Sequence, residues 1–569
     1  MSLNFLKNNS YLFISIALII FAVLPLFHPG FFTIHDNEQI GRLYELDQAL
    51  KSGQFPVRIV QDLGFGFGYL LFNFYPPAVY YLGELFHLLQ FSFIDSIKIV
   101  MGIGFIFSAV FMYLLVKELF GKTGALVASV FYTYAPYHSV DLYVRGALSE
   151  FFSFVFLPAI FWSYLKLSKD NSKRYVVSTS LFNFLLVITH NLVALMASFF
   201  VFVWVLFLLY SSKSRKKLSI NIFLTLLFSA LISSFFVIPA LLENKFTMVS
   251  LLTKELADYN IHFVYPIQFW NSVWGYGGSA AGLADGLSFN LGKLYIFLVL
   301  VSALLSVYFF IKRKLNKVIP LFLIFFLLSL FLQTSYSKIV WDNFNALSYL
   351  QFPWRFLIFS AFFSSFLVGS IFSFIKNEKL GLVAGLCAVF LVVYFEKKYF
   401  VPQNFLNNSD EYYTNQKFLR FDTSKMSFEY VPKGIATKKS EIGNTVVDID
   451  DSQIAKSTFT VVSGKMLIET KKDSPNEKIM KVTVLKDGTF RLNEYYYPGW
   501  TLYVDGQKIA IRDDNKLKLI TFNLSSGEHS IKAVFEDTTI RKISNYLSLT
   551  GVILIILYAL FPTKKYEKA

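Results

Sequence analysis

Residues 10–38 read SYLFISIALIIFAVLPLFHPGFFTIHDNE, an apolar run that ends in a cluster of polar and acidic side chains. The run at 10–29 matches the roughly 20 residues that a helix needs to cross the hydrocarbon core of a bilayer. No small-residue cleavage site follows its prolines, so we expect the run to stay in the chain as a transmembrane helix. The acidic cluster is then expected to lie just outside the membrane.

The rest of the chain repeats this pattern. Of its 569 residues, 55% are hydrophobic and 16% are charged, against about 25% charged residues in soluble proteins. This composition excludes a cytosolic enzyme, a disordered chain, a collagen and a coiled coil. Twelve apolar runs are predicted to span the membrane: 10–29, 95–116, 122–138, 147–165, 175–190, 192–210, 218–240, 291–311, 318–335, 354–375, 380–396 and 544–562.

Basic residues predict the orientation of these spans, because Lys and Arg are enriched in cytoplasmic loops. With twelve spans and a cytoplasmic N-terminus, the basic loops at 166–174, 213–217 and 312–317 all fall on the cytoplasmic side. A further span at 76–91 would break this rule, so we expect an interfacial helix there. The sequence thus predicts a multi-pass protein of the plasma or inner membrane with both termini cytoplasmic. The net charge of +15 is attributed to this orientation, not to nucleic-acid binding.

The chain divides into three predicted parts. Residues 1–396 form a helical transmembrane domain with outer loops at 30–94 and 241–290, and residues 544–569 hold the last helix and a cytoplasmic tail. Between them, residues 397–543 are more polar, with 42 of 147 residues charged against 49 of 422 elsewhere. We expect this segment to be a soluble domain outside the cytoplasm.

Turn residues predict strands in the second half of that domain. Asp487-Gly488, Asp505-Gly506 and Ser526-Gly527 each separate alternating runs, which is a strong hairpin signal. The expected fold is therefore an α-helical polytopic membrane protein with a β-sandwich inserted before its last helix.

Polar groups at the outer ends of the apolar runs are the candidate functional residues, because such groups are costly near a membrane. His35, Asp36 and Glu38 follow the first span directly. A carboxylate at this position could act as a general base or a metal ligand. The alternative is that Asp36 simply caps a helix over 37–50.

The segment HSVDLYVRGALSEFF supplies a second group of charges at the same side. Arg145 could bind a phosphate with two hydrogen bonds, and Glu150 lies one turn inside an apolar run. The alternative is a local ion pair between Asp141 and Arg145, four residues apart.

Four more candidate residues lie at the outer ends of later runs or in the middle loop. His190 in ITHNLVALM could orient a substrate or a carboxylate, or lie in a tight turn. Arg355 in LSYLQFPWRFLIF could clamp a lipid phosphate, or anchor the helix at the interface. Trp270 and Trp274 in the middle loop could stack on sugar faces, or belong to an interfacial aromatic belt.

Several catalytic signatures are missing from the sequence. It contains no Walker motif, HExxH, CxxC or GxSxG. Chemistry driven by cytoplasmic ATP is therefore disfavoured. An enzyme that works at the outer face must take an activated substrate from the membrane itself.

The order of these motifs resembles the GT-C class of polytopic membrane glycosyltransferases. The shared features are HDNEQIGRLYELDQALKSGQFPVR after the first span, then LGFGFGYLLFNFYPPAVYYLGELF, KELFG, RGALSE, THNL, QFPWRF and YYYPGWTLYVDGQKI. The sequence is similar in particular to bacterial membrane proteins labelled as related to 6-pyruvoyl-tetrahydropterin synthase, although that soluble enzyme's zinc-site pattern is absent. It is also similar to membrane proteins that glycosylate lipoteichoic acid.

The resemblance implies a function. GT-C enzymes pass a sugar from a polyprenyl-phosphate carrier to an acceptor at the outer face, with inversion. Asp36 matches the first-loop catalytic Asp, and Glu150 lies where a second acid is often found. Metal-dependent members use a DxD-like motif; here it is Asp36-x-Glu38, which allows a divalent cation such as Mg²⁺ or Mn²⁺ without requiring one. Arg145 and Arg355 are the expected partners of the carrier phosphate, and a cell-envelope glycan or glycolipid is the expected acceptor.

Two other functions remain open at this stage. A lipid or polysaccharide transporter would carry charged or helix-breaking residues near the midplane of several spans, in two related halves. An envelope-polymer assembly protein without catalytic activity would use the β-domain to bind carbohydrate. Replacing Asp36 by Asn separates a glycosyltransferase from an assembly protein, because an assembly protein would keep its function.

Overall fold

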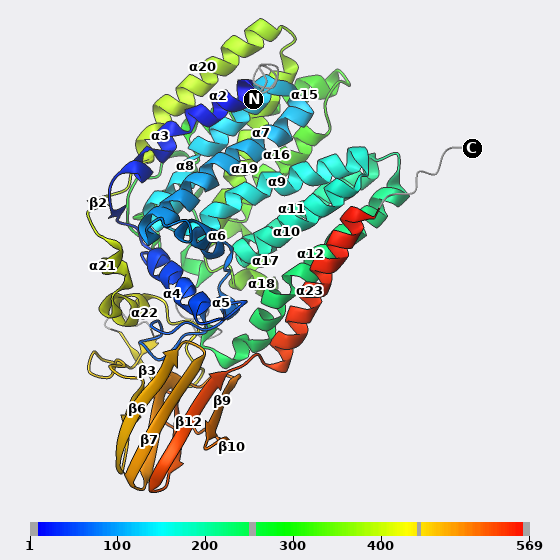
Figure 1. Cartoon of the computed structure of the whole chain (residues 1–569). Helices are drawn as coiled ribbons and strands as arrows, with labels where there is room; N and C mark the ends of the chain where they lie inside the picture. The colour runs from blue at the N-terminus through cyan, green and yellow to red at the C-terminus, as the bar shows by residue number, and fades with distance from the viewer. Residues whose placement is uncertain (1–9, 250–257, 441–444, 562–569) are drawn as a thin grey trace.

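The computed structural model of the chain describes residues 10–249, 258–440 and 445–561. Long helices form a bundle, and a β-domain lies at one end of it (Figure 1). The last helix, α23, leaves the β-domain and returns along the bundle beside α12. The predicted tail at 562–569 lies outside the described residues, as does part of the middle loop.

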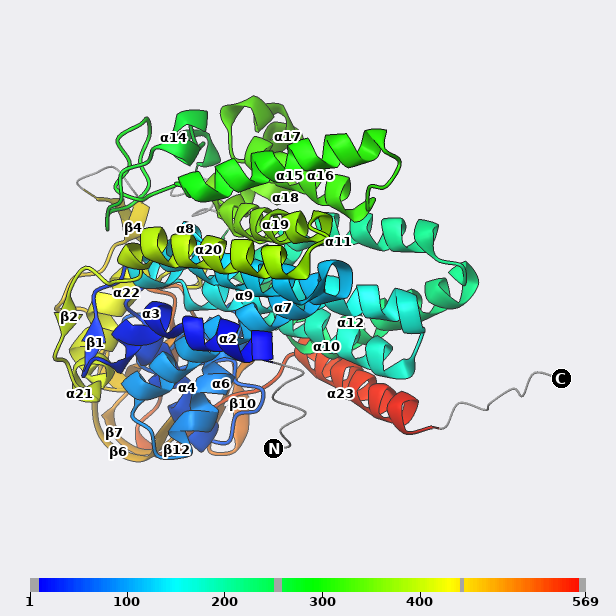
Figure 2. The same ribbon diagram turned by 90° about the horizontal axis from the view of Figure 1, so that it is seen from above.

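The bundle is built from long apolar helices. Their bounds are α7 (Phe93–Tyr134), α9 (Leu148–Asp170), α10 (Lys173–Thr189), α11 (Asn191–Ser211), α12 (Arg215–Glu243), α15 (Lys293–Ile311), α16 (Val318–Phe331), α19 (Leu357–Ser370), α20 (Glu378–Glu396) and α23 (Thr539–Leu560). The first apolar run forms α2 (Ser10–Leu18), α3 (Ile20–Val23) and the 3₁₀ turn η1 (Leu24–Phe27). Figure 2 shows α7 and α9 between α15, α16 and α19 on one side and α10, α12 and α23 on the other.

Helix α7 carries two of the predicted spans, because its backbone breaks at Gly121, where φ is +81°. The ring centroids of Phe105 and Tyr134 lie 6.0 and 5.2 Å from that of Phe400. In one straight helix, residues this far apart in sequence would be separated by about 43 Å. The two halves of α7 therefore run antiparallel, side by side.

This break accounts for part of the difference between the twelve predicted spans and the number of membrane-length helices. Within the described residues, nine helices are long and apolar enough to cross a membrane, or ten if α16 is joined to the bent segment Ser335–Asn343. The second half of α7 and the 17-residue α10 are the two other predicted spans. Each is shorter than the roughly 20 residues that a helix needs to cross the hydrocarbon core.

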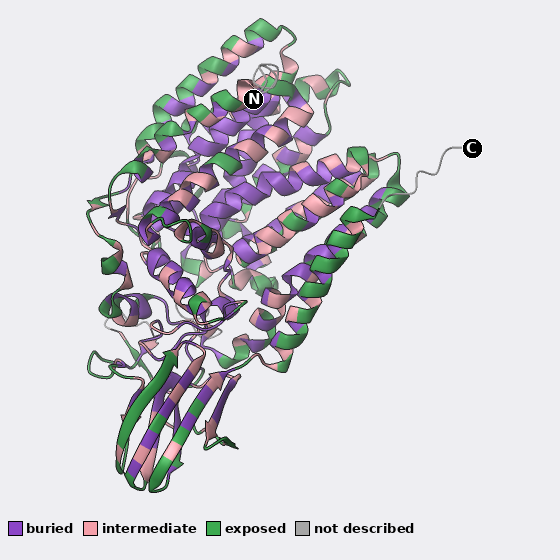
Figure 3. Cartoon of the chain, in the orientation of Figure 1, coloured by how far each residue is buried: buried purple, intermediate pink, exposed green. Residues whose placement is uncertain are grey.

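Aromatic side chains fill the centre of the bundle, and small polar side chains form hydrogen bonds between its helices. Phe161 of α9 packs against Phe322 and Phe362, with ring centroids 5.6 and 5.2 Å away. Helices α9 and α19 are buried along most of their length (Figure 3). Between helices, the hydroxyls of Ser329 and Ser360 are 2.9 Å apart, a polar contact that favours helix association within lipid.

The first outer loop folds into short elements on the outer end of the bundle. They are β1 (Phe31–Phe32), α4 (Gln39–Lys51), α5 (Leu71–Phe74) and α6 (Ala78–His87). With ten residues, α6 is too short to span a membrane, which agrees with the interfacial helix expected at 76–91. Strand β1 pairs with β2 (Phe405–Leu406), so the start of the inserted segment is tied to the end of the first span.

The inserted segment contains the predicted β-rich domain. Two antiparallel sheets have the orders β10-β9-β12-β7-β6 and β11-β8-β5. Met480, Val482 and Val484 alternate with less buried residues along β7, so one face of the larger sheet is covered. The bounds are β3 (Thr437–Lys439), β4 (Thr445–Val447), β5 (Phe459–Val461), β6 (Lys465–Ser474), β7 (Glu477–Lys486), β8 (Gly488–Tyr495), β9 (Trp500–Val504), β10 (Gln507–Ile509), β11 (Leu519–Leu524) and β12 (Gly527–Phe535).

The hairpin prediction holds at one turn and is wrong at two. Asp505 and Gly506, with φ of +53° and +79°, join the paired strands β9 and β10, as a type I′ turn does. Asp487-Gly488 and Ser526-Gly527 instead carry the chain from one sheet to the other. Turn chemistry predicts a reversal but not the partner strand, and here Asp487 Oδ1 accepts a hydrogen bond from the Ser526 N–H at 2.6 Å, which links the two crossings.

A glycine-rich segment of the first outer loop joins the β-domain to the bundle. The Tyr495 N–H donates to the Phe67 carbonyl at 2.7 Å, and Arg420 pairs with Asp62 at 2.6 Å. Gly68 has a φ of +73°, and a Cβ there would lie 2.2 Å from Glu494 Oε2. Only glycine allows the loop to approach the β-domain this closely.

Candidate functional site

Glu150 is the centre of a buried charged cluster at the end of the bundle that is predicted to lie outside. It lies in the first turn of α9 and is 1% exposed. Arg145 Nη1 and Arg355 Nε lie 3.0 and 3.4 Å from its Oε2 atom. The Tyr137 hydroxyl donates a hydrogen bond to Oε1 at 2.6 Å. One carboxylate thus holds two guanidinium groups that are 210 residues apart in the sequence.

Arg145 is fixed from several sides. It pairs with Asp141, donates to the Tyr137 hydroxyl at 3.2 Å, and its guanidinium carbon lies 4.7 Å from the Trp354 ring centroid. Arg145 is the last residue of a π-helical turn, η2 (Val140–Arg145), and the glycine that follows it has a left-handed backbone conformation. The predicted Asp141–Arg145 ion pair is therefore present, as one part of a larger cluster.

Gly146 explains the RGALSE motif. Its φ is +68°, and a Cβ there would lie 2.4 Å from the Ile34 side chain. The turn can reverse beneath the first outer loop only with glycine at this position. The reversal brings Arg145 and Glu150 into contact, with Ile34 packed against Gly146, which lies between them in the sequence.

His190 completes the cluster. Its Nε2 atom lies 4.0 Å from Glu150 Oε2, and its Nδ1 atom accepts a hydrogen bond from the Val193 N–H at 3.0 Å, which caps α11. In a neutral ring that accepts at Nδ1, the proton is on Nε2 and faces Glu150. His190 therefore lies in the tight turn that was the alternative interpretation, and its ring also lies near the Glu150 carboxylate.

Asp36 lies against this cluster through the backbone. Its N–H donates to the Arg145 carbonyl at 2.8 Å, and the His35 N–H donates to the Val144 carbonyl at 3.1 Å. Asp36 interacts electrostatically with both Arg145 and Asp141. Its half-buried carboxylate makes no hydrogen bond or ion pair within the described residues. It does not cap the following helix, because the N-cap position of α4 is Glu38.

Glu38 pairs instead with Arg42, four residues on, at 2.9 Å. Burial raises the pKa of Glu38 to about 7, although Arg42 opposes the shift. The Arg42 guanidinium lies 4.3 Å from the Tyr75 ring centroid. Burial also raises the pKa of Glu429, a residue of the inserted segment that interacts electrostatically with Arg42 and Asp36.

The remaining predicted residues lie farther from Glu150. His35 Nε2 contacts the Tyr276 carbonyl at 2.8 Å, which ties the first outer loop to the middle loop. Trp274 stacks on Tyr399 with centroids 4.4 Å apart. Trp270, the last residue of α14 (Pro266–Trp270), is 45% exposed, and its ring centroid lies 5.5 Å from the Lys293 ammonium. The structure brings neither tryptophan into contact with the Glu150 cluster.

Three residues of the site were not among the candidates. Tyr137 contacts Glu150 and Arg145, and Trp354 contacts Arg145. Tyr137 directly precedes the motif HSVDLYVRGALSEFF and Trp354 lies within LSYLQFPWRFLIF, so proximity to a motif was the available signal. Glu429 belongs to the inserted segment and no local pattern marks it. Its place in the site depends on a contact across about 390 residues of chain.

No set of three His, Cys, Asp or Glu side chains is arranged to hold a metal ion within residues 10–249, 258–440 and 445–561. Asp36 and Glu38 form the DxD-like pattern of this sequence, and Glu38 already pairs with Arg42. A cation bound by both would therefore compete with that guanidinium.

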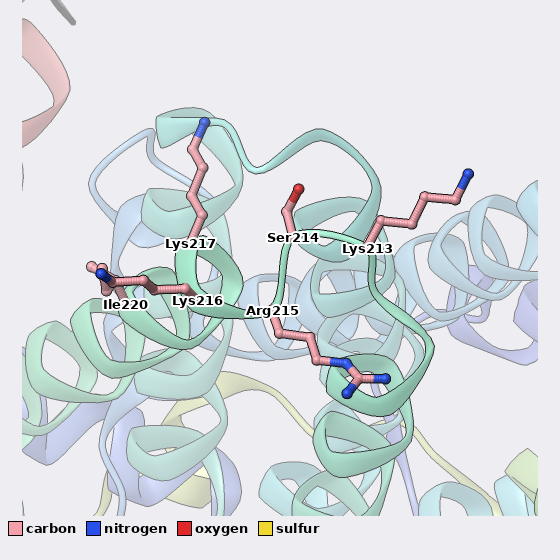
Figure 4. Close-up of a pocket in the computed structure, with 6 residues that line it drawn as sticks. All are labelled: Lys213, Ser214, Arg215, Lys216, Lys217 and Ile220. Carbon is pink, nitrogen blue, oxygen red and sulfur yellow. The ribbon is translucent and has the colours of Figure 1, made fainter.

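A surface pocket of about 430 Å³ lies at the other end of the bundle. It is lined by Lys213, Ser214, Arg215, Lys216, Lys217 and Ile220 at the turn before α12 (Figure 4). Asn221, just beyond it, bonds to Asn171 at the far end of α9, which places the pocket about 30 Å from Glu150 along that helix. The basic turn at 213–217 and the Glu150 cluster thus lie at opposite ends of the bundle.

The chain is similar to several solved membrane enzymes. These are the apo oligosaccharyltransferase from Archaeoglobus fulgidus (13% identity, 72% of this chain and 59% of that one, TM-score 0.42) and the arabinofuranosyltransferase AftD from Mycobacteria (12%, 70% and 28%, 0.41). A third is ArnT from Cupriavidus metallidurans bound to undecaprenyl phosphate (12%, 69% and 90%, 0.30). The chain thus spans less than two thirds of the oligosaccharyltransferase and of AftD.

None of the functionally curated proteins matches this sequence. A family model does match: residues 72–400, more than half of the chain, fit the 6-pyruvoyl-tetrahydropterin synthase related domain, described as a membrane protein. This agrees with the resemblance found in the motifs and with the many membrane-length helices. The chain is therefore a multi-pass membrane protein that belongs to the family with a 6-pyruvoyl-tetrahydropterin synthase related domain.

Proposed function

We propose that this protein is an integral-membrane glycosyltransferase. It would move a sugar from a polyprenyl-phosphate carrier to a cell-envelope glycan or glycolipid at the outer face, with inversion at the anomeric carbon. The observation that carries the proposal is a half-buried Asp36 carboxylate without a hydrogen-bond partner among the described residues. It lies beside a cluster in which Glu150 holds two guanidinium groups.

This arrangement suits the reaction chemically. Asp36 would take the proton of the acceptor hydroxyl while that oxygen bonds to the anomeric carbon. The bond from that carbon to the carrier phosphate would break, and its electron pair would leave with the phosphate. The leaving group needs cationic stabilisation more than a proton, which is the role proposed for Arg145 and Arg355.

The neighbouring residues have supporting roles in the proposal. Glu150, as the second acid, would keep the two guanidinium groups together, and the Nε2 side of His190 would help to orient that carboxylate. Glu38 is proposed as an acid of the first loop, and a divalent cation held by Asp36 and Glu38 would supply further positive charge for the leaving phosphate. Trp270 and Trp274 are proposed only as contacts for sugar rings at the periphery.

The site's position favours transfer over transport. A transporter requires its charged residues near the midplane of the bilayer, whereas Glu150, Arg145 and Arg355 lie at one end of their helices. A non-catalytic assembly protein would have no use for an unpaired carboxylate beside the Arg145 end of this charged cluster. The sequence resemblance to GT-C enzymes, which aligns Asp36 with a catalytic acid, supports the same choice.

The test compares envelope glycans from a deletion strain complemented with wild-type protein, Asp36→Asn or Asp170→Asn. Asp170 is the matched control, because it lies at the opposite end of α9 in an exposed pair with Arg174. We expect one sugar decoration to be lost in the deletion strain and in Asp36→Asn, and to be kept in Asp170→Asn. An Asp36→Asn protein that is present at normal levels and restores the full glycan profile would overturn the proposal.

A further inference from the structure

A second group of buried charges lies where the β-domain meets the membrane helices. Arg541, in the first turn of α23, is 0% exposed, and Arg58, from the first outer loop, is 2% exposed. Arg541 Nε donates to Glu243 Oε2 at 2.8 Å, and Arg58 Nη2 donates to Asn545 Oδ1 at 3.0 Å. This group shares no residue with the Glu150 cluster, and the proposed reaction does not use it.

Most of the donor atoms in this group have no acceptor. Arg541 Nη1 and Nη2 and Arg58 Nε and Nη1 are all buried without a hydrogen-bond partner in the part of the chain that the structure describes. The indole Nε1 of Trp500, a residue 5% exposed, is also unpartnered. The Phe535 ring links these side chains, since its centroid lies 4.8 Å from the Arg541 guanidinium and 5.5 Å from the Trp500 ring.

Neighbouring acceptors do not satisfy these donors. Glu243 accepts from Arg541 through Nε alone, and Asp537 accepts from Asn545, with no hydrogen bond to either guanidinium. Asn73 Oδ1 is a single unpartnered neutral acceptor near Glu243. Buried donors are almost always paired in native proteins, so five such nitrogens in one place indicate a missing acceptor.

The two guanidinium groups are also close enough to repel each other. Burial, aided by the charge of Arg541 and opposed by that of Asp537, lowers the pKa of Arg58 to about 10. Arg58 therefore stays charged at neutral pH. A group with several negatively charged oxygens would relieve the repulsion and accept hydrogen bonds from both side chains at once.

The motif YYYPGW, which the proposed reaction leaves unused, forms one wall of this group. Gly499 has a φ of +121°, and a Cβ there would lie 3.0 Å from Arg541 Nη1 and 2.6 Å from the Glu536 carbonyl oxygen. Glycine is therefore needed for the turn to pass beside the guanidinium. The next residue, Trp500, packs against the same Phe535 ring as Arg541, and its indole N–H is unpartnered.

We propose that Arg58, Arg541 and Trp500 form a binding site for a phosphate group, carried by a membrane lipid headgroup or present as free phosphate. The site lies at the start of a membrane-spanning helix, the level at which lipid headgroups are found. Apolar side chains of α12 and α23 just beyond it, Leu242 and Ile543, are 51% and 55% exposed, as expected of a surface that contacts acyl chains. The site is separate from the proposed transferase centre and does not depend on it.

The test is native mass spectrometry of the purified full-length protein. It is offered phosphatidylglycerol, diacylglycerol without a phosphate, or inorganic phosphate. The variants are Arg58→Gln, which removes one charge, and Trp500→Phe, which removes one neutral donor and keeps both charges. Arg215→Gln, in the exposed basic pocket at the other end of the bundle, controls for non-specific attraction of anions.

We expect wild-type protein to retain phosphate or phosphatidylglycerol, but not diacylglycerol. Arg58→Gln should weaken that binding at least about tenfold and Trp500→Phe about threefold, because each loses hydrogen bonds to the anion. Arg215→Gln should leave it unchanged. Preference for phosphatidylglycerol over inorganic phosphate would identify the source as lipid, and the reverse would identify free phosphate.

The proposal fails if wild-type protein binds neither phosphate form, which would mean that water fills the site. It also fails if Arg58→Gln and Trp500→Phe bind phosphate as well as wild type does. Should Arg58→Gln not fold, Trp500→Phe and the wild-type comparison with diacylglycerol still decide the matter. Loss of binding with normal glycans in the same strain would separate this site from the transferase proposal.

Discussion

Replacing Glu150 and Arg355 singly and together tests whether the buried cluster acts as one electrostatic unit. Their atoms are 3.4 Å apart, and opposite charges at that distance attract by about 5 kcal/mol at an effective dielectric constant of about 20. Glu150→Gln keeps the shape and the Tyr137 hydrogen bond, but it leaves the buried Arg355 without its ion-pair partner and Arg145 with Asp141 alone. Breaking a buried pair in this way costs about 3–5 kcal/mol.

The double variant Glu150→Gln/Arg355→Gln should cost less than the sum of the two single variants, by at least about 1 kcal/mol, because the second change removes the charge that the first leaves unpaired. The assay is an SDS unfolding titration of the purified protein in mixed micelles. Asp170→Asn is the control, since its exposed ion pair with Arg174, at 3.1 Å, should contribute under about 1 kcal/mol. Single effects that add within about 0.5 kcal/mol would refute the reasoning.

Three further predictions follow from the same geometry. Burial, with a contribution from Asp62, raises the pKa of Glu45 from 4.5 to about 8, so the folded protein holds a proton that the unfolded chain releases. The free energy of unfolding should therefore fall as the pH rises from 4.5 to 8. A Glu45→Gln variant with the same pH dependence in the SDS titration would contradict this. Gly551→Leu should destabilise the α12–α23 contact by about 1–3 kcal/mol, because a Cβ there would lie 2.7 Å from Leu231 Cβ. The control Gly278→Ala, with open space around it, should be neutral. Equal SDS unfolding midpoints for the two variants would refute the prediction. Asp36→Asn should lower the rate of sugar transfer from a polyprenyl-phosphate donor about 10²–10⁴-fold while the unfolding midpoint stays unchanged, and a normal rate in vitro would exclude Asp36 as the base.

Hydropathy predicted the membrane-spanning helices because the requirement is local: a helix in lipid must be long and apolar over consecutive residues. The separate runs on either side of Gly121 correctly anticipated two antiparallel helices within α7. The β-domain shows where such reasoning ends. Asp487-Gly488 has the composition of a hairpin turn, yet β7 and β8 belong to different sheets, and the choice of partner strand depends on packing across the whole domain.

The candidate site was predictable to the extent that its residues interrupt apolar runs. Arg145, Glu150 and Arg355 stand out in the sequence for this reason, and the structure places them together. Glu429 lies in a polar segment where one more acid carries no signal. Its proximity to Arg42 and Asp36 comes from docking of the inserted segment on the first outer loop, which no local pattern encodes.

The ion pair between Asp62 and Arg420 joins positions 358 residues apart, and this separation has a consequence for biosynthesis. At a typical rate of about 5–20 residues per second, the ribosome needs roughly 20–70 s to make the second partner after the first has emerged. During that interval the glycine-rich loop has no β-domain to dock on. The first outer loop therefore remains undocked while most of the helices are still being inserted. This end of the molecule assembles late, after most of the helices have been made.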